Sequence, residues 1–386
     1  MGYNRREMAR GGDEYTAPLP VLSLFSGAGG LDLGFEGGGF LPLLALDNDP
    51  AAVETYNWNR RQEGGPARIA DLAAVDPATI IAWWKERTGG TTRPVGVIGG
   101  PPCQAFSVSN VHKLEDDLRA KLPLAYARIL SAFNRRFALD FFLFENVAGL
   151  GHRPHSSFLE AFMTEFGNAG FNVKSFHLDA VRFRVPQYRN RMFIVGFNSS
   201  RHTTSGFLPP PGDNVRSTVK EAIYGLPEPQ YFSRGRRPVE VGLHPNHWCM
   251  NPRSPKFRNG TLGAGAMLGR PFRMLKWCAP SWTVAYGHRE VHVHPNGTRR
   301  LSVYEAMRLQ ALPPDYELRG TLSDQFRLVS DAVPPPLARA LALAIRDFIS
   351  CPVAAARANE HPLASGHSEQ AGLLGVQTVA PRSTSE

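Results

Sequence analysis

Five short apolar runs alternate with longer amphipathic stretches over the first half of the chain. The apolar runs are PVLSLFS, LPLLALD, VGVIGG, FFLFENV and RMFIVGF. The stretches between them, AAVETYNWNRR, ATIIAWWKERT, LAYARILSAFNRR and SFLEAFMTEFGNAG, carry apolar residues at helical spacing. This alternation predicts an α/β fold with a mostly parallel sheet, because consecutive parallel strands are joined by helical crossovers.

The sequence pattern changes in the second half of the chain, where helical periodicity gives way to stretches rich in turn-forming residues: PPPGD, PEPQ, RGRRP, NPRSP and NGTLGAGAMLG. We expect the first part of a larger domain over residues 18–197 and a small loop-rich domain over 198–280, with a boundary that could extend to about 299. The chain then returns to the larger domain over 281–350, which ends in the helical pattern LARALALAIRDFI. Residues 1–17 are predicted to be a flexible N-terminus and residues 351–386 a disordered tail.

The excess positive charge is confined to one segment. Residues 198–299 hold 14 Lys and Arg against five Asp and Glu, which accounts for the whole net charge of +9. A localised basic region is typical of proteins that bind a polyanion, most often nucleic acid. The alternative is a merely soluble basic surface.

Several other classes of protein are not favoured. No apolar stretch approaches the length that spans a bilayer, and the N-terminus lacks the apolar core of a secretory signal. The four cysteines are too few and scattered for a disulfide framework. Cys249 and Cys278, near His244 and His247, match no metal-binding spacing, so we expect no metal. A cytoplasmic, monomeric protein without membrane contacts is the expectation.

The first apolar run ends in the glycine-rich turn FSGAGG, which comprises residues 25–30 and precedes a helical pattern. Glycines at a strand-to-helix turn let a ligand approach the backbone, and the N-terminus of the helix offers free N–H groups. The next apolar run ends in Asp47, where an acid can accept hydrogen bonds from ribose hydroxyls. The pair indicates a nucleoside-cofactor site, although a glycine-rich turn is often only a turn.

Three further groups follow the ends of apolar runs. Cys103 lies behind two prolines that stiffen its loop, at the sheet edge where α/β folds place their sites. A lone cysteine is more often a small buried residue, but this position favours a nucleophile. FFLFENV ends in Glu145-Asn146-Val147, and QYRNR places Gln187, Arg189 and Arg191 at alternate positions, which could clamp an anion or a base edge. Each group alone could be a solvated strand end.

Together and in this order, these motifs resemble those of the cytosine-5 DNA methyltransferases. The Phe-x-Gly-x-Gly turn, Pro-Cys-Gln, Glu-Asn-Val and Gln-x-Arg-x-Arg all occur with family-like spacing, over about residues 20–197 and 280–348. The resemblance implies a Rossmann-like methyltransferase domain with a mixed, mostly parallel sheet, interrupted by a small target-recognition domain. It implies S-adenosylmethionine as cofactor and double-stranded DNA as substrate.

The resemblance also assigns roles to individual residues. The implied catalytic residues are Cys103, Glu145, Arg189 and Arg191. The implied cofactor-binding residues are Phe25, Gly27, Gly29, Gly30, Asp47, Asn48, Asp71, Leu72, Pro101, Leu122, Asp331 and Val333. The implied substrate-binding residues are Gln104, Ser107, Asn146, Val147, Gln187, Arg258 and Thr261.

The chemistry of the reaction explains these residue types. Cytosine C5 is a poor nucleophile until a thiolate adds to C6, which requires an ionised Cys103. Charge that develops at N3 and O2 needs a proton donor and a cation, roles that suit a protonated Glu145 and Arg191. The target base must also leave the duplex stack to be reached.

Three positions depart from the family pattern: Ser23 replaces an acid, Ala120 replaces a glycine, and Ser330-Asp331 replaces Gly-Asn. They concern cofactor binding, and we expect Asp331 to lie near the ammonium group of the cofactor. The modification enzyme of a restriction-modification system, with a cognate endonuclease, is the expected setting, and an orphan enzyme fits equally. A tRNA cytosine-5 methyltransferase, a catalytically silent nucleic-acid-binding protein and a Rossmann oxidoreductase are competing interpretations of the same sequence.

Overall fold

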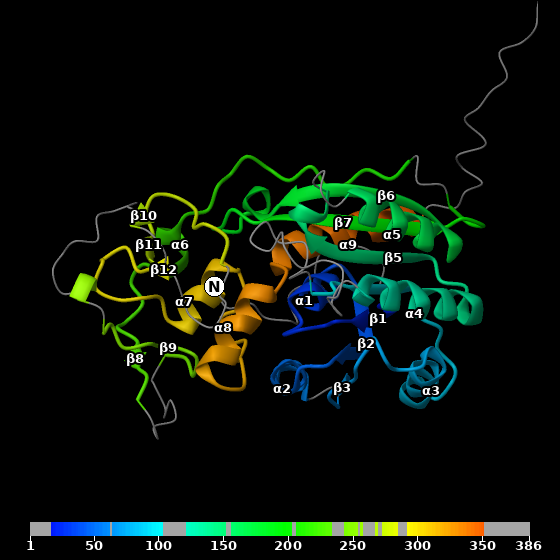
Figure 1. Ribbon diagram of the computed structural model, residues 1–386, viewed down its shortest axis with the longest axis horizontal. Coiled ribbons are helices and arrows are strands. Elements are labelled where there is room, and N and C mark those ends of the chain that lie inside the picture. The colour runs from blue at the N-terminus through cyan, green and yellow to red at the C-terminus, as the bar shows by residue number, and fades with distance from the viewer. Residues whose placement is uncertain are drawn as a thin grey trace, which may run out of the picture. The chain divides into compact units, whose positions relative to one another are not determined.

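Seven strands of the described part of the chain form one sheet, with strand order β3-β2-β1-β4-β5-β7-β6 (Figure 1). Its strands are β1 (Leu19–Leu24), β2 (Phe40–Asp47), β3 (Ala67–Ile69), β4 (Gly96–Gly99), β5 (Phe141–Val147), β6 (Phe171–Asp179) and β7 (Asn190–Asn198). The first five strands pair in parallel, and β7 runs antiparallel between β5 and β6. The predicted α/β fold with a mixed, mostly parallel sheet is confirmed.

The computed structural model describes residues 17–61, 64–102, 121–151, 156–202, 206–233, 243–253, 255–257, 267–268, 272–284 and 292–350. The predicted flexible N-terminus and disordered tail therefore lie outside the described residues, apart from residue 17. The predicted division into a catalytic and a target-recognition domain stays a prediction.

Helices cover both faces of the sheet. They are α1 (Gly30–Gly37), α2 (Pro50–Asn59), α3 (Pro77–Thr88), α4 (Leu122–Phe137), α5 (Ser156–Asn168) and α9 (Pro335–Ser350). Trp84, Tyr126 and Phe166 of α3, α4 and α5 pack in the core of one face, and Phe35 and Leu341 of α1 and α9 pack in the core of the other. Two covered faces explain why the central strands read as continuous apolar runs rather than as alternating ones.

The last helix of this part, α9, packs against the first one (Figure 1). A Cβ atom on Gly34 would lie 2.3 Å from that of Ala338, and one on Gly38 would lie 2.5 Å from that of Ala342. Small residues on both helices therefore allow their backbones to approach closely. This contact holds α1, and with it the glycine turn that precedes α1, against α9.

A second group of elements follows β7 and supplies most of a further buried cluster, to which Ala28 and Ala52 also belong. It comprises α6 (Val219–Ile223), β8 (Gln230–Tyr231), β9 (Trp248–Cys249), β10 (Met267–Leu268), β11 (Phe272–Met274), β12 (His292–Val293), α7 (Val303–Leu309) and α8 (Leu322–Asp331). Single 3-10 turns span Ala148–Gly151, Ala180–Phe183 and Pro255–Phe257. Val219, Met307 and Phe326 of α6, α7 and α8 belong to one buried cluster. The short strand β3, the antiparallel strand β6 and α8 were not predicted from the sequence.

One run, Leu322–Ser350, is long and apolar enough to cross a membrane by length and composition alone. It consists of α8 and α9, joined by residues 332–334, and 61% of its most apolar window is buried within the fold. Leu328 of α8 and Leu341 of α9 are buried in two different cores. Helices that bury their apolar faces in this way are core helices of the fold.

Candidate active site

The order of the sheet reverses between β1 and β4, which are neighbours although β2 and β3 lie between them in the sequence. Ligands of doubly wound α/β folds bind beyond the carboxyl ends of the strands at such a switch point. The glycine turn follows β1 here, and Pro101 and Pro102 follow β4. The predicted cofactor turn and the predicted nucleophile loop thus begin on neighbouring strands.

The glycine turn is held by the carboxylate at the end of β2. Phe25, Gly27 and Gly29 all have positive φ angles, of 53°, 53° and 81°. The Gly27 N–H donates to Asp47 Oδ2 at 2.8 Å, and the Asp49 N–H donates to Asp47 Oδ1 at 2.9 Å. Burial raises the pKa of the Asp47 carboxyl, and these two hydrogen bonds oppose that rise. Asp47 therefore orders the turn, and its oxygens retain further lone pairs for a ligand.

The turn is closed behind and open in front, which fits a ligand that approaches the backbone. A Cβ atom on Gly30 would lie 2.5 Å from the carbonyl oxygen of Val333, and one on Gly29 would lie 3.0 Å from the Arg60 guanidinium. A Cβ atom on Gly27 would meet no described atom within 4 Å. The packing behind the turn brings Val333 to it and leaves the Gly27 side accessible.

Four of the remaining predicted cofactor residues, Asn48, Asp71, Leu72 and Pro101, follow strands of the sheet, and Leu122 begins a helix. Asn48 is exposed directly after β2. Asp71 is exposed and accepts from the Ala73 N–H at 2.9 Å, while Leu72 is buried. Pro101 is buried after β4, and Leu122 is the first residue of α4.

Glu145 and Arg191 form the charged centre of this edge of the sheet. Arg191 Nε lies 3.0 Å from Glu145 Oε1, and both side chains are largely buried. Burial raises the pKa of the Glu145 carboxyl; the charges of Arg191 and Arg189 lower it, and the charge of Asp331 raises it further. A carboxyl group whose proton is favoured by burial, beside a fixed guanidinium, can donate a proton and stabilise negative charge.

Gly100, which the sequence analysis missed, makes room for this carboxylate. A Cβ atom at position 100 would lie 2.6 Å from Glu145 Oε2. Gly100 is the last residue before Pro101, so the chain that enters the nucleophile loop passes directly against Glu145. The double glycine before PPC was the available signal in the sequence.

Arg189 and Gln187 are buried and bound to main-chain groups. Arg189 donates to the carbonyls of Val284 at 3.3 Å and Ser330 at 2.6 Å. Gln187 accepts from the Val284 N–H at 3.1 Å and donates to the Leu309 carbonyl at 3.4 Å. Whereas Arg191 pairs with Glu145, these two side chains fasten residues 281–284 and α8 to the sheet. Sequence reasoning missed the segment 281–284.

The Asn146 side chain is almost fully buried at the end of β5. Its Oδ1 accepts from the Val147 N–H at 2.9 Å, and its Nδ2 has no hydrogen-bond partner within the described residues. An unsatisfied buried donor is costly, so a partner supplied by a bound base or by a loop would be favoured. Val147 is half-buried beside it.

Five predicted site residues lie outside the described residues: Cys103, Gln104, Ser107, Arg258 and Thr261. Asp331 ends α8, where the Ser330 hydroxyl donates to Asp331 Oδ1 at 3.2 Å. The described ranges contain no group of three His, Cys, Asp or Glu side chains that could hold a metal ion.

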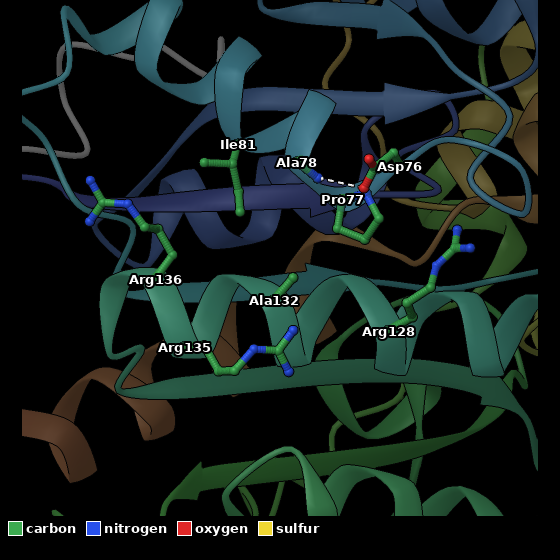
Figure 2. A pocket seen from close by; sticks show the side chains of 8 residues that line it. All are labelled: Asp76, Pro77, Ala78, Ile81, Arg128, Ala132, Arg135 and Arg136. Carbon is green, nitrogen blue, oxygen red and sulfur yellow. Dashed lines mark hydrogen bonds between the residues drawn. The ribbon is translucent and has the colours of Figure 1, made fainter.

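A hollow of about 470 Å³ lies apart from this edge, between α3 and α4. Figure 2 shows Asp76 at the start of α3 and Arg128, Arg135 and Arg136 along α4. Arg128 donates from Nη2 to the carbonyls of Leu72, Ala73 and Val75, at 3.2, 3.3 and 2.9 Å. These bonds hold the loop that carries Asp71 and Leu72. Arg128 therefore contacts both the hollow that it lines and the loop predicted to bind adenine.

Comparisons with known proteins give one consistent result. A family model described as C-5 cytosine-specific DNA methylase matches residues 19–234 and 254–347. The type II methyltransferase M.NmeDI of Neisseria meningitidis serogroup C is 30% identical over 364 residues, which cover 85% of this chain and 84% of that protein. M.MthTI of Methanothermobacter thermautotrophicus is 31% identical over 350 residues, which cover 85% and 97%.

Solved structures agree in fold. A protein assigned as a DNA modification methyltransferase of an E. coli prophage superposes with a TM-score of 0.68 at 24% identity, covering 86% of this chain and 99% of that one. The S. pombe Dnmt2 methyltransferase gives a TM-score of 0.57 at 18% identity, covering 86% and 98%. At these identities the likeness concerns the fold alone.

Proposed function

We propose, from the premise that this chain belongs to the C-5 cytosine-specific DNA methylase family, that it methylates C5 of a cytosine flipped out of a specific DNA sequence. Family membership makes the chain a DNA methyltransferase; the mechanism, the cofactor contacts and the target are our proposal. The observation that carries it is the buried Glu145–Arg191 ion pair, with Gly100 against its carboxylate.

The nucleophile of the proposed reaction is Cys103. Its thiolate adds to C6 and forms a sulfur–carbon bond, while the electron pair of the C5–C6 double bond shifts to C4–C5 and that of C4–N3 shifts to N3, which makes C5 nucleophilic. Position 103 comes three residues after Gly100, which lies against Glu145. The chain therefore enters the nucleophile loop beside the proposed proton donor.

Glu145 supplies the proton that the ring nitrogen N3 receives as the thiolate adds. The buried environment favours its protonated form, which a proton donor needs. The Arg191 guanidinium lies beside the carboxyl and stabilises negative charge on O2 and N3. Arg189 acts as a positioning residue, because its described bonds hold Val284 and Ser330 rather than an open site.

S-adenosylmethionine is the proposed cofactor, and when bound it supplies the methyl group that C5 receives. The open side of Gly27 fits a ligand that approaches the backbone closely. The remaining lone pairs of Asp47 can accept hydrogen bonds from ribose hydroxyls. Asp71 and Leu72 would hold the adenine. Methyl transfer leaves S-adenosylhomocysteine as the second product. A base then removes the C5 proton, whose electron pair restores the C5–C6 double bond as the Cys103 thiolate leaves, and the N3 proton returns to Glu145.

The DNA is proposed to be read by residues 198–299, which carry the whole excess charge of the chain. The related proteins M.NmeDI and M.MthTI are named type II methyltransferases. We therefore propose that the protein is the modification enzyme of a restriction-modification system, with a cognate endonuclease as functional partner and a cytoplasmic location.

The test is methylation of unmodified genomic DNA, with every 5-methylcytosine then mapped by bisulfite sequencing. A single recurrent sequence context, lost in Cys103→Ser, is the expected result. DNA with 5-fluorocytosine at the target should trap a covalent complex on a denaturing gel, because the final proton cannot be removed. Trapping that persists in Cys103→Ala would overturn the assignment of the nucleophile.

A further inference from the structure

The glycine turn has a second anchor on the side away from its open face. The Tyr316 hydroxyl, which is buried, donates a hydrogen bond to the carbonyl of Ala28, the residue between Gly27 and Gly29. Arg60 Nη1 in turn donates to the Tyr316 hydroxyl at 3.5 Å. A residue 288 positions along the chain thus fixes the peptide that joins the two left-handed glycines.

Arg60 is itself held in a buried network under the turn. Its guanidinium lies 3.8 Å from the centre of the Tyr56 ring, and its Nε lies 2.6 Å from Glu36 Oε1. The Tyr56 hydroxyl donates to Asp32 Oδ1 at 2.9 Å. Because these groups come from α1 and α2, the Tyr316 hydroxyl meets a rigid partner rather than a mobile side chain.

Residues 316–319, which we call the strap, are bound along both edges by asparagine side chains. On one edge, Asn59 of α2 donates to the Glu317 carbonyl at 2.7 Å and accepts from its N–H at 3.0 Å. On the other edge, Asn246 donates to the Leu318 carbonyl at 2.9 Å and accepts from its N–H at 2.9 Å. Each amide satisfies both main-chain groups of one residue, as a neighbouring strand would.

The Asn246 side chain is fixed in this orientation from its own side. Its Nδ2 also donates to Gln325 Oε1 at 2.9 Å, and Trp248 Nε1 donates to the same oxygen at 2.8 Å. Asn246 and Trp248 belong to the segment proposed to read DNA. The strap therefore lies between that segment and the predicted cofactor turn, with direct hydrogen bonds to each.

We propose that the strap positions the cofactor turn and links it to the target-recognition segment, so that cofactor affinity and DNA affinity are coupled through Tyr316 and Asn246. The inference rests on the proposed function, since it requires both ligands to bind where that function places them. Tyr316 is a positioning residue, because it acts through the Ala28 carbonyl. Coupling of this kind is reciprocal: DNA that orders the strap tightens the cofactor by the same factor by which the cofactor tightens DNA.

The first test is calorimetric titration of S-adenosylhomocysteine into Tyr316→Phe, which removes one oxygen atom and keeps the ring. We expect affinity to fall about tenfold, the effect of one lost hydrogen bond on a turn that must be ordered for binding. Affinity for DNA without cofactor should stay at the wild-type value. The matched control is Tyr126→Phe, whose buried hydroxyl also donates to main-chain carbonyls, those of Val97 and Leu143, away from the turn.

The second test repeats the titration with protein saturated by the duplex that bisulfite sequencing identifies. The wild type should bind S-adenosylhomocysteine more tightly with DNA than without, and Asn246→Ala should reduce this ratio toward one. Asn57→Ala is the control, because the Asn57 amide likewise donates to the carbonyl and accepts from the N–H of a single residue, Ala67, outside the strap and outside residues 198–299.

The possible outcomes separate the two proposals. Wild-type protein that binds no S-adenosylhomocysteine would contradict the proposed function itself. If Tyr316→Phe binds S-adenosylhomocysteine as tightly as the wild type does, the strap inference alone is overturned. The same holds if Tyr126→Phe loses as much affinity for S-adenosylhomocysteine as Tyr316→Phe does. An unchanged ratio in Asn246→Ala would overturn the coupling.

Discussion

Glu145 and Arg191 meet diagonally across two antiparallel strands at the carboxyl edge of the sheet. Val147 of β5 is paired with Arg191 of β7, so Glu145, two residues earlier on the same face, is the diagonal neighbour of Arg191. The long guanidinium spans this diagonal and brings Nε to 3.0 Å from Glu145 Oε1. The reversal of β7 within an otherwise parallel neighbourhood is therefore what creates the ion pair.

The pH dependence of the reaction follows from the charges around Glu145. A proton donor must be protonated, so activity that depends on Glu145 falls as pH rises through its pKa. The charge of Asp331 helps to raise that pKa. Asp331→Asn removes the charge, lowers the pKa of Glu145 and should move the alkaline limb of the kcat/KM profile to lower pH.

Glu86→Gln serves as the control for this shift, because Glu86 is a surface carboxylate paired with Arg68, outside residues 198–299. Its profile should match the wild type. The affinity of Asp331→Asn for S-adenosylmethionine, measured by calorimetry, tests the separate expectation that Asp331 meets the ammonium group. A superimposable alkaline limb in Asp331→Asn would contradict the role of Glu145 as proton donor.

Gly100→Ala should damage catalysis without unfolding the protein. The added methyl group would lie 2.6 Å from Glu145 Oε2 and must displace that carboxyl from its place beside Arg191. Displacement of a catalytic group by about 1 Å can lower kcat by about 100-fold. Gly167→Ala is the matched control, since a Cβ atom there meets nothing within 4 Å among the described residues. Steady-state kinetics measure kcat for both variants. A wild-type kcat in Gly100→Ala would show that the Glu145 carboxyl does not need the space left by Gly100.

Arg128→Ala should raise the KM for S-adenosylmethionine and leave the KM for DNA unchanged. Arg128 holds the carbonyls of Leu72, Ala73 and Val75, so its loss frees the loop proposed to contact the adenine. These bonds are partly exposed, and we expect a change of about fivefold, equivalent to about one hydrogen bond. Arg135→Ala, on the same helix and bonded to Ser131, is the control. If Arg128→Ala and Arg135→Ala have the same KM for S-adenosylmethionine, Arg128 does not order the loop that contacts the adenine.

The elements that carry site residues could be predicted because their signals are local. The ends of β1, β2, β4 and β5 coincide with changes from apolar runs to turn residues, so Asp47 and Glu145 were placed correctly at strand ends. Helix α8 was missed although Thr321 and Asp324 form a capping box at its start, a pattern visible as Thr-x-x-Asp. Strand β6 was missed because its half-buried face reads as mixed rather than apolar.

The contacts that define the site could not be predicted, because they depend on register and on distant segments. Alternation alone placed Gln187, Arg189 and Arg191 on one face, but their partners differ: residues 281–284 fold back over the first two and leave Arg191 for Glu145. The bonds of Asn246 to Leu318 join positions 72 residues apart. No pattern in either segment indicates the other.

The basic segment offers one described arginine whose surroundings allow a clear test. Arg273 lies at the centre of β11, where Phe272 and Met274 are buried and Arg273 is exposed. Its side chain therefore projects away from the small core that its neighbours form. We expect Arg273→Ala to weaken DNA binding and to leave the binding of S-adenosylhomocysteine unchanged.

Two forms of that loss distinguish how Arg273 contacts DNA. A contact to phosphate should weaken cognate and scrambled duplexes alike and lower the slope of log affinity against log salt by about one. A contact to a base should cost about 1–3 kcal/mol on the cognate duplex alone and relax specificity at one position. Fluorescence anisotropy across a salt series measures both quantities. The control is Arg68→Ala, an arginine paired with Glu86 outside the basic segment, which should bind DNA as the wild type does. If Arg273→Ala binds both duplexes as tightly as Arg68→Ala at every salt concentration, β11 does not face the DNA.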